Sequence, residues 1–163
     1  DPVGRLVLYL CREHRAETAA WSDSICTGLQ LANFWQDVAR DFDIGRIYLP
    51  QEDRDRFGYS RDDFNQRVTN AAFLDLMRFE VERARAFLVA GLPLVPRLPG
   101  RLQVDVDLFA RGGLKILERI ERIGYRTWDS RPVVKKSDVV KLGLAALIRA
   151  CGRRLVPRRT TTP

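Results

Sequence analysis

Apolar residues recur every three or four positions along most of the chain, which is the period of one face of an α-helix. Clusters of glycine, proline, aspartate and serine separate these stretches and mark helix ends. No stretch shows the strict alternation of apolar and polar residues that a half-buried β-strand requires. The pattern therefore predicts an all-α protein. The expected helices are Pro2–Cys11, Glu17–Phe42, Arg61–Ala90, Val104–Ile123 and Asp138–Cys151.

The segments between these helices carry helix-breaking residues. Asp43–Gly45 ends the second helix, and Arg46–Ser60 follows as a loop. Gly91–Arg101 is rich in proline and glycine, so it is expected to connect two helices of one domain. Tyr125–Lys136 is predicted to be irregular. Within the fourth helix, the pair Gly112–Gly113 is expected to allow close packing against another helix.

The helix expected at Glu17–Phe42 has two different faces. Its apolar face consists of Leu31, Phe34, Trp35, Val38 and Phe42. Beside this face, at 100° per residue, a file of polar side chains falls within an arc of roughly 80°. The file consists of Gln30, Asn33, Asp37 and Asp41. A carboxylate beside a core is costly unless positive charge meets it, so the two aspartates are expected to have a cationic partner.

Length and composition favour one folded domain. The 163 residues are 45% apolar, which predicts a single helical domain over 1–163 with a substantial core. Cys11, Cys26 and Cys151 are odd in number and far apart, which favours reduced thiols and a cytoplasmic location. The chain begins at Asp1 rather than at methionine, so it is expected to be part of a longer protein.

The formal net charge of +7 is concentrated at the end of the chain. Residues 152–163 hold arginines and no acidic residue, so a flexible basic tail is predicted there. Such a tail is either simply solvated or rests on anionic lipid at the inner membrane surface. Elsewhere basic and acidic residues interleave, and no nucleic-acid-binding motif is present, so nucleic acid is not expected as a partner.

The spacing of the two aspartates is by itself weak evidence for a site. Chance alone gives about one Asp-x-x-x-Asp pattern in a chain with this many aspartates. Asn33, one turn before Asp37, makes the combination much less common. Carboxylate and amide oxygens in line suit a hard cation such as Mg²⁺. A solvent-exposed helix face, with Arg40 and Arg46 as ion-pair partners, remains the alternative.

The stretch QLANFWQDVARDFDIGRIYLP, residues 30–50, resembles the second aspartate-rich motif of the squalene/phytoene synthase family. Weaker similarity extends over PVGRLVL and over GGLKILERIERIGYRTWDSRPVVKKSDVVKL. The resemblance implies the isoprenoid-synthase helical fold, of which this chain would be the C-terminal half. The family's first aspartate-rich motif is absent here. The N-terminal half is therefore expected as a partner, and the fragment alone is expected to be inactive.

The resemblance also implies site residues for a Mg²⁺-dependent reaction of a prenyl diphosphate. Asn33, Asp37 and Asp41 would hold the metal and act as the catalytic group. The remaining residues would bind substrate: Gln30, Arg46, Arg40, Tyr125, Lys135, Lys136 and Phe34. Among these, the arginines offer forked donors to phosphate oxygens, and an aromatic face such as that of Phe34 stabilises a cation.

Within the family, Gln36 favours the hydroxysqualene synthase branch. Phytoene synthases tend to carry a basic residue just before the first aspartate, where this chain has Gln36. The expected reaction converts presqualene diphosphate to hydroxysqualene by ionisation, rearrangement and capture of water. Head-to-head condensation, from farnesyl diphosphate to presqualene diphosphate or to phytoene, is the alternative within the family. A non-catalytic basic helical binding module is the alternative from another class.

Overall fold

The computed structural model describes residues 1–154, and within that range it contains helices, turns and loops but no strand. The all-α prediction is confirmed. The elements are α1 (Pro2–Leu10), α2 (Ala16–Gln36), α3 (Val38–Asp43), α4 (Gln51–Arg56), α5 (Arg61–Asn65), α6 (Ala71–Gly91), the 3₁₀-helix η1 (Leu92–Arg97), α7 (Gly100–Arg122) and α8 (Lys136–Arg154). α8 continues to Arg154, so the prediction of a flexible tail is wrong for residues 152–154, which are helical. Residues 155–163 lie outside the described residues, and their flexibility stays a prediction.

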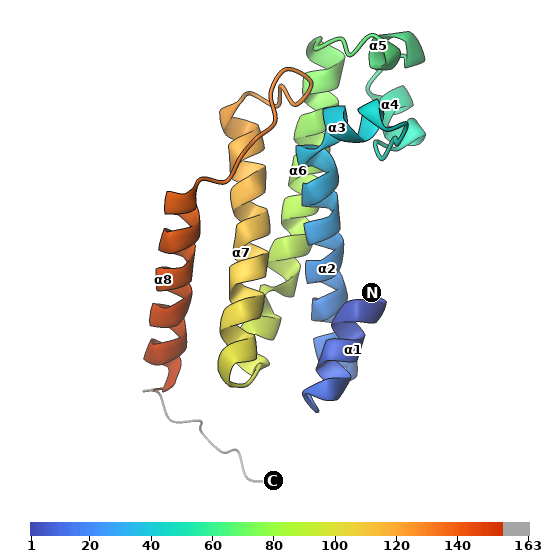
Figure 1. Ribbon diagram of the computed structural model, residues 1–163. Helices are drawn as coiled ribbons and strands as arrows, with labels where there is room; N and C mark the ends of the chain where they lie inside the picture. Colours follow the sequence, from blue (N-terminus) through green and yellow to red (C-terminus); the bar gives the residue numbers. More distant parts are fainter. Residues whose placement is uncertain (155–163) are drawn as a thin grey trace.

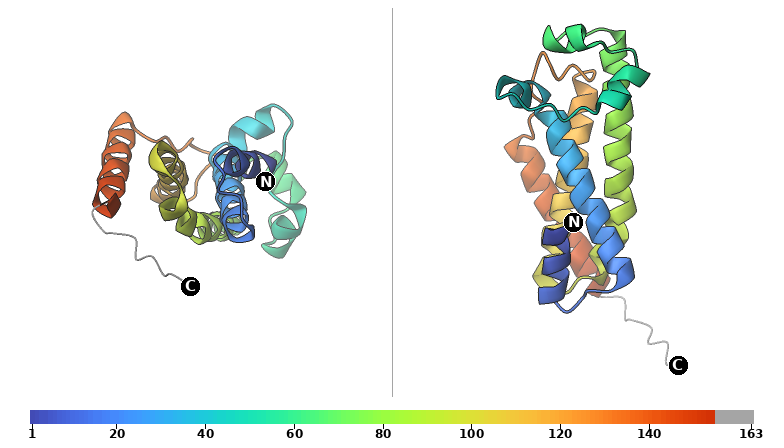
Figure 2. Two further views of the ribbon diagram at one scale, coloured as in Figure 1. Left: turned by 90° about the horizontal axis from the view of Figure 1, so that it is seen from below. Right: turned by 90° about the vertical axis from the view of Figure 1, so that its right-hand side faces the viewer.

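Four long helices form an up-and-down bundle. Figure 1 shows α2, α6, α7 and α8 running in alternating directions, and Figure 2 shows α7 between α8 and α2. α1 packs on α2, whereas α3, α4 and α5 gather at the upper end of the bundle in Figure 1. The loop between α7 and α8 lies at the same end. Segments that are far apart in the sequence therefore meet where α2 stops.

The tightest packing in the core joins α2 to α6. At two glycines the helices approach so closely that a β-carbon would not fit. A β-carbon on Gly28 would lie 2.9 Å from the backbone nitrogen of Leu88, and one on Gly91 would lie 2.7 Å from the backbone oxygen of Trp21. Large side chains fill the space around these contacts and are fully buried. They include Trp35, Phe73, Leu76, Leu88 and Leu117.

The glycine pair in α7 behaves differently at its two positions. A β-carbon on Gly113 would lie 2.8 Å from Cδ2 of Leu29, whereas one on Gly112 would meet nothing within 4 Å. The prediction of close packing is therefore confirmed for Gly113 and wrong for Gly112. Gly113 lets α7 approach the middle of α2.

The helix predicted at Glu17–Phe42 is in fact two helices, which meet at Asp37. The backbone of Asp37 has φ −108° and ψ 17°, and its N–H is shared between the carbonyls of Asn33 at 3.0 Å and Phe34 at 3.3 Å. The prediction of one continuous helix is therefore wrong at Asp37, where contacts with a distant segment of the chain coincide with the interruption. The side-chain amide of Gln36 donates to the carbonyl of Pro132 at 2.7 Å, so the loop after α7 holds the end of α2.

Two further boundaries differ from the prediction. The loop expected at Arg46–Ser60 contains α4, whose acidic first turn and basic last turn suit the helix dipole. The helix expected at Arg61–Ala90 is divided into α5 and α6. Arg67 adopts a left-handed backbone with φ 55° between them, and the side chain of Asn70 starts α6 by accepting a hydrogen bond from the Phe73 N–H.

The last two helices begin earlier than predicted. α7 starts at Gly100 rather than at Val104, directly after Pro99. α8 starts at Lys136, where the side chain of Asp138 accepts a hydrogen bond from the Lys135 N–H at 3.0 Å. The segment between α7 and α8 has no regular helix or strand, as predicted.

Candidate functional site

The aspartates lie at the upper end of the bundle, where α2 gives way to α3. Backbone hydrogen bonds continue through the junction, from the Asp37 N–H to the Asn33 carbonyl and from the Asp41 N–H to the Asp37 carbonyl. Successive members of the file are therefore one helical turn apart despite the bend. Gln30 and Asn33 are exposed, whereas Asp37 and Asp41 are half-buried.

A glycine turn ends α3 and sends the chain back across the junction. The N–H of Gly45 donates to the Phe42 carbonyl, and the N–H of Arg46 donates to the Asp41 carbonyl at 2.8 Å. This is the Schellman arrangement, and it requires the positive φ of 75° that Gly45 adopts. The turn places Arg46 directly beside the last turn of α3.

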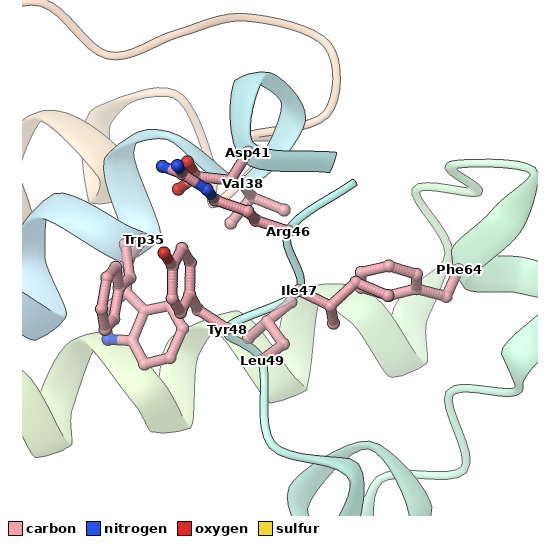
Figure 3. Close-up of a pocket in the computed structure, with 9 residues that line it drawn as sticks. Trp35, Val38, Asp41, Arg46, Ile47, Tyr48, Leu49 and Phe64 are labelled. Carbon is pink, nitrogen blue, oxygen red and sulfur yellow. The ribbon is translucent and has the colours of Figure 1, made fainter. Parts of the chain in front are cut away.

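The residues that follow, Arg46–Pro50, form what we term the crossover segment. Tyr48 stacks on Phe34 with ring centroids 3.8 Å apart, and Leu49 is buried. The crossover segment and the α2–α3 junction enclose a small notch. Figure 3 shows Asp41 and Arg46 side by side there, on one side of Tyr48. Because Tyr48 covers a face of Phe34, that ring is less available to a substrate than the sequence indicates.

Arg131 is the cationic partner of the first aspartate. Its Nε donates to Oδ1 of Asp37 at 2.6 Å and its Nη2 donates to Oδ2 at 3.2 Å, a bidentate pair. Only 16% of the Asp37 side chain is exposed, and the hydrogen bond to Asp37 raises the pKa of Arg131 above its ordinary value. Arg40 lies at 3.8 Å from the same carboxylate. Asp37 thus has cationic partners within the protein, and Arg40 is the one that the alternative of an ion-paired helix face names.

Sequence reasoning does not find Arg131. It is 94 residues from Asp37, in a segment with no periodic pattern. The available signal is its place immediately before Pro132, inside the stretch that resembles the family's C-terminal part. Spacing alone could not show which of the many arginines forms the ion pair with Asp37.

The remaining predicted residues follow α7, in the loop before α8 and at the start of α8. Tyr125 has a left-handed backbone with φ 61°, packs against the main core, and has the guanidinium of Arg78 5.3 Å from its ring centre. Lys135 and Lys136 are exposed at the start of α8. Within residues 1–154, neither lysine forms an ion pair with the aspartates. Their substrate contacts stay predictions.

The donor set suits a metal ion that is shared with a ligand. Among the described side chains, no group of three or more histidine, cysteine, aspartate or glutamate residues could form a complete metal cage. The file offers two carboxylates and the amide of Asn33. Mg²⁺ typically keeps several waters and is held by one or two carboxylates together with substrate phosphates, which this set matches.

An apolar pocket lies lower in the bundle, on the same side of α2. Its volume is about 300 Å³, and α1, α2, η1 and α7 line it. Leu29 is one of its lining residues and falls on the same helical stripe as Asn33 and Asp37. At 1.5 Å per residue, Leu29 is roughly 12 Å from Asp37 along α2. One face of α2 therefore carries the aspartate at its charged end and, about two turns earlier, a residue that lines the apolar pocket.

An all-α bundle with an aspartate-rich helix end above an apolar pocket defines a protein of the isoprenoid-synthase-like helical class. The squalene/phytoene synthase family model matches residues 1–138, and the chain belongs to this family. The resemblance seen in the sequence is confirmed.

The chain is similar to relatives from more than one branch of the family. It is 47% identical over 108 residues to a 15-cis-phytoene synthase of a Synechocystis species, which covers 64% of this chain and 31% of that protein. It is 29% identical over 124 residues to a hydroxysqualene synthase of Rhodopseudomonas palustris, which covers 74% of this chain and 41% of that protein.

A solved structure shares the fold. The squalene synthase HpnC from Alicyclobacillus acidocaldarius superposes with a TM-score of 0.73 at 41% identity, over 76% of this chain and 47% of that one. The prediction of an isoprenoid-synthase helical fold is therefore confirmed. The chain spans about a third to a half of the length of the curated relatives that it matches.

Proposed function

We propose that the protein containing this chain is a Mg²⁺-dependent prenyl-diphosphate enzyme, and that this chain supplies the second aspartate-rich wall of its site. The observation that carries the proposal is the arrangement of Asp37 and Asp41, one turn apart, at the charged end of a helix face that leads to an apolar pocket. A prenyl diphosphate has the matching form, with an anionic head and an apolar chain.

Each residue has a distinct role in this proposal. Asp37 and Asp41 hold Mg²⁺ and Asn33 completes the oxygen set, while Gln30 orients a ligand or water. When bound, the metal acts as a Lewis acid that neutralises the departing diphosphate. Arg46, at the rim of the notch, and Arg40 bind phosphate oxygens through forked donors. Tyr125, Lys135 and Lys136 would close the site from the α7–α8 side.

Arg131 has two roles in the proposal. While it is paired with Asp37 it holds that carboxylate in place and balances its charge. If Asp37 held Mg²⁺ together with a bound diphosphate, the Arg131 guanidinium would be available to donate to a phosphate oxygen. Exchanging one anionic partner for another would let the site gain a ligand contact while the Arg131 guanidinium keeps an anionic partner.

The branch that we propose is hydroxysqualene formation. The neutral Gln36 supports it, since this side chain is buried and bonded to the Pro132 carbonyl rather than presented to the ligand as a basic group. The identity to a phytoene synthase favours condensation as the second candidate. In this proposal a part of the protein outside this chain would supply the first aspartate-rich motif, so this chain alone is proposed to be inactive.

The experiment is product analysis of the full-length protein with Mg²⁺. Presqualene diphosphate and farnesyl diphosphate are supplied separately, and the products are identified by mass spectrometry. We expect hydroxysqualene from presqualene diphosphate. A condensation product from farnesyl diphosphate would assign the second candidate. Absence of turnover together with absence of Mg²⁺-dependent diphosphate binding would leave a binding module and reject the enzyme proposal.

We further propose that the protein works in the cytoplasm, at the inner surface of the membrane. No helix within residues 1–154 is long and apolar enough to cross a bilayer. α8 nevertheless exposes a stripe of large apolar side chains just before the basic tail. The stripe consists of Val140, Leu144, Leu147 and Ile148. Apolar contact combined with basic charge favours binding to an anionic lipid surface.

Vesicle co-sedimentation tests the membrane proposal. The variant replaces four arginines by alanine: Arg153, Arg154, Arg158 and Arg159. At about 1 kcal/mol for each basic residue near an anionic surface, the four arginines together contribute about 4 kcal/mol, so binding at low salt should fall by up to about a thousandfold. Zwitterionic vesicles serve as the control. If the variant pellets with anionic vesicles as the wild type does, the membrane proposal is rejected.

A further inference from the structure

A buried glutamate lies beneath α4, away from the aspartate pair. Glu80 is on α6 and 0% of its surface is exposed. Its neighbours along α6 on the same face are apolar and buried, among them Met77, Val81 and Ala84. A carboxylate in such a place is costly unless it is neutralised by a proton or by a well-placed cation.

Glu80 shares one cationic partner, Arg83, with a second carboxyl group, that of Asp53, so the charges do not balance if both carboxyl groups are ionised. Arg83 of the same helix lies with Nη1 3.5 Å from each oxygen of Glu80. The same nitrogen donates at a much shorter 2.8 Å to Oδ2 of Asp53 on α4. Two carboxyl groups thus compete for one guanidinium, and Asp53 has the better bond.

Among the described residues of α2, α4, α7 and η1, which pack against α6, none forms an ion pair with Glu80, and Arg83 of α6 itself is its one cationic partner within residues 1–154. The buried positions of α2, which packs against α6, carry no charged side chain. Arg54 of α4 lies over the ring of Phe64, 4.9 Å from its centre. Burial, followed by the hydrogen bond to Asp53 and its charge, raises the pKa of Glu80 to about 7. Glu80 therefore holds a proton in mildly acidic solution, and in that form it can act as a donor toward Asp53, with which it shares Nη1 of Arg83.

The contact between Asp53 and Glu80 affects the candidate site, because α4 is joined directly to the crossover segment. α4 begins directly after Pro50, the last residue of the crossover segment. That segment carries Arg46 and Tyr48, which reach the notch beside Asp41. Besides the polar contact between Asp53 and Arg83, an apolar contact joins α4 to α6. Phe57, directly after α4, has its ring 5.4 Å from that of Phe79 on α6. Whatever holds α4 on α6 therefore also fixes one end of the crossover segment.

We propose that Glu80 is a positioning residue, which anchors α4 through a proton shared with Asp53 and so sets the position of Arg46 and Tyr48. The role assigned to Arg46 rests on the proposed function, but the anchoring itself does not. When Glu80 loses its proton, two carboxylates face one guanidinium, and α4 separates more readily from α6.

The direction of the pH dependence follows from the raised pKa. Separation of α4 exposes Glu80 to water, where its pKa returns toward the ordinary value of 4.5. The docked state then binds more protons than the open state between pH 4.5 and about 7. Docking is strongest below this window, weakens by about tenfold per pH unit through it, and is constant above it.

Hydrogen exchange of the full-length protein without substrate tests the proposal. We expect the protection of amides in residues 46–57, corrected for the intrinsic pH dependence of exchange, to fall about tenfold between pH 5.5 and 6.5. Glu80→Gln keeps the shape and a donor for Asp53 but cannot ionise. In this variant the corrected protection of amides 46–57 should therefore be independent of pH. Glu82→Gln, the same exchange at an exposed position of α6, should keep the wild-type slope.

Two results would overturn the proposal: a wild-type protein whose corrected protection does not change with pH, or a slope that persists in Glu80→Gln. Asp53→Asn provides a second variant, because Glu80 then has Arg83 to itself and the slope should shrink. Because no substrate is present, the result is independent of the reaction. If the protein is the proposed enzyme, the substrate KM of the wild type should rise as the pH increases from 4.5 to about 7, level off above this window, and show no such rise in Glu80→Gln.

Discussion

Replacing Asp37 and Asp41 together by asparagine is expected to abolish Mg²⁺-dependent binding of diphosphate. Each carboxylate would lose its charge but keep its size and its place one turn from the other. If each is worth about 1.4 kcal/mol or more toward the metal–diphosphate complex, affinity falls by at least about a hundredfold. Isothermal titration of the full-length protein with inorganic diphosphate, with and without Mg²⁺, measures the change.

The matched control removes the same charge elsewhere. Asp62→Asn with Asp75→Asn changes two exposed aspartates on α5 and α6 and should leave the affinity within about twofold of the wild type. The control matters because the chain has a net charge of +7, and any loss of acid alters its general attraction for anions.

Single variants separate the metal role of the aspartates from the ion pair with Arg131. Asp37 has the bidentate bond to Arg131, whereas no ion pair of Asp41 occurs among the described side chains. If Asp37 only holds Arg131, then Asp37→Asn and Arg131→Gln should have the same effect and Asp41→Asn none. If both carboxylates hold metal, Asp41→Asn alone should lower the Mg²⁺-dependent affinity by about tenfold. Unchanged affinity in Asp41→Asn would contradict the proposed site.

The sequence predicts the helical class well because local periodicity is strong. The apolar stripe that contains Trp35 reappears in the core, and Gly45 has the left-handed backbone that ends α3. Backbone hydrogen bonds keep Asn33, Asp37 and Asp41 one turn apart through the α2–α3 junction, as their spacing predicts. These features depend on contacts within a few residues, so a single sequence contains them.

What the sequence does not predict depends on contacts between distant segments. The bend at Asp37 coincides with bonds from Gln36 and Asp37 to residues 131–132, almost a hundred positions later. The stacking of Tyr48 on Phe34 requires the turn at Gly45 to bring the chain back. The sequence likewise does not distinguish Glu80 from the other polar residues of its helix, because only the folded chain brings Asp53 and Glu80 to the same arginine.

Gly91→Ala is expected to be the most destabilising small substitution in the bundle. Its β-carbon would lie 2.4 Å from Cγ1 of Ile25, 2.7 Å from the backbone oxygen of Trp21 and 3.0 Å from the backbone nitrogen of Ile25. Two of these are backbone atoms, which cannot move unless α2 shifts away from α6. Overpacking of this kind costs about 1–3 kcal/mol, and the upper part of that range is expected here. Urea unfolding of the full-length protein should show a lower midpoint with an unchanged slope.

Gly112→Ala is the matched control, because the same substitution in α7 meets nothing within 4 Å. Alanine is a better helix former than glycine, so this variant should gain about 0.5–1 kcal/mol. Gly113→Ala should fall between the two, since its nearest neighbours are the ends of Leu29 and Leu88 side chains, which can turn aside. Equal midpoints for Gly91→Ala and Gly112→Ala would mean that α2 and α6 are not held as closely as the glycines indicate. The aspartate file would then lack the rigid support that α2 takes from α6, because the same helix carries both the packing contact and the site.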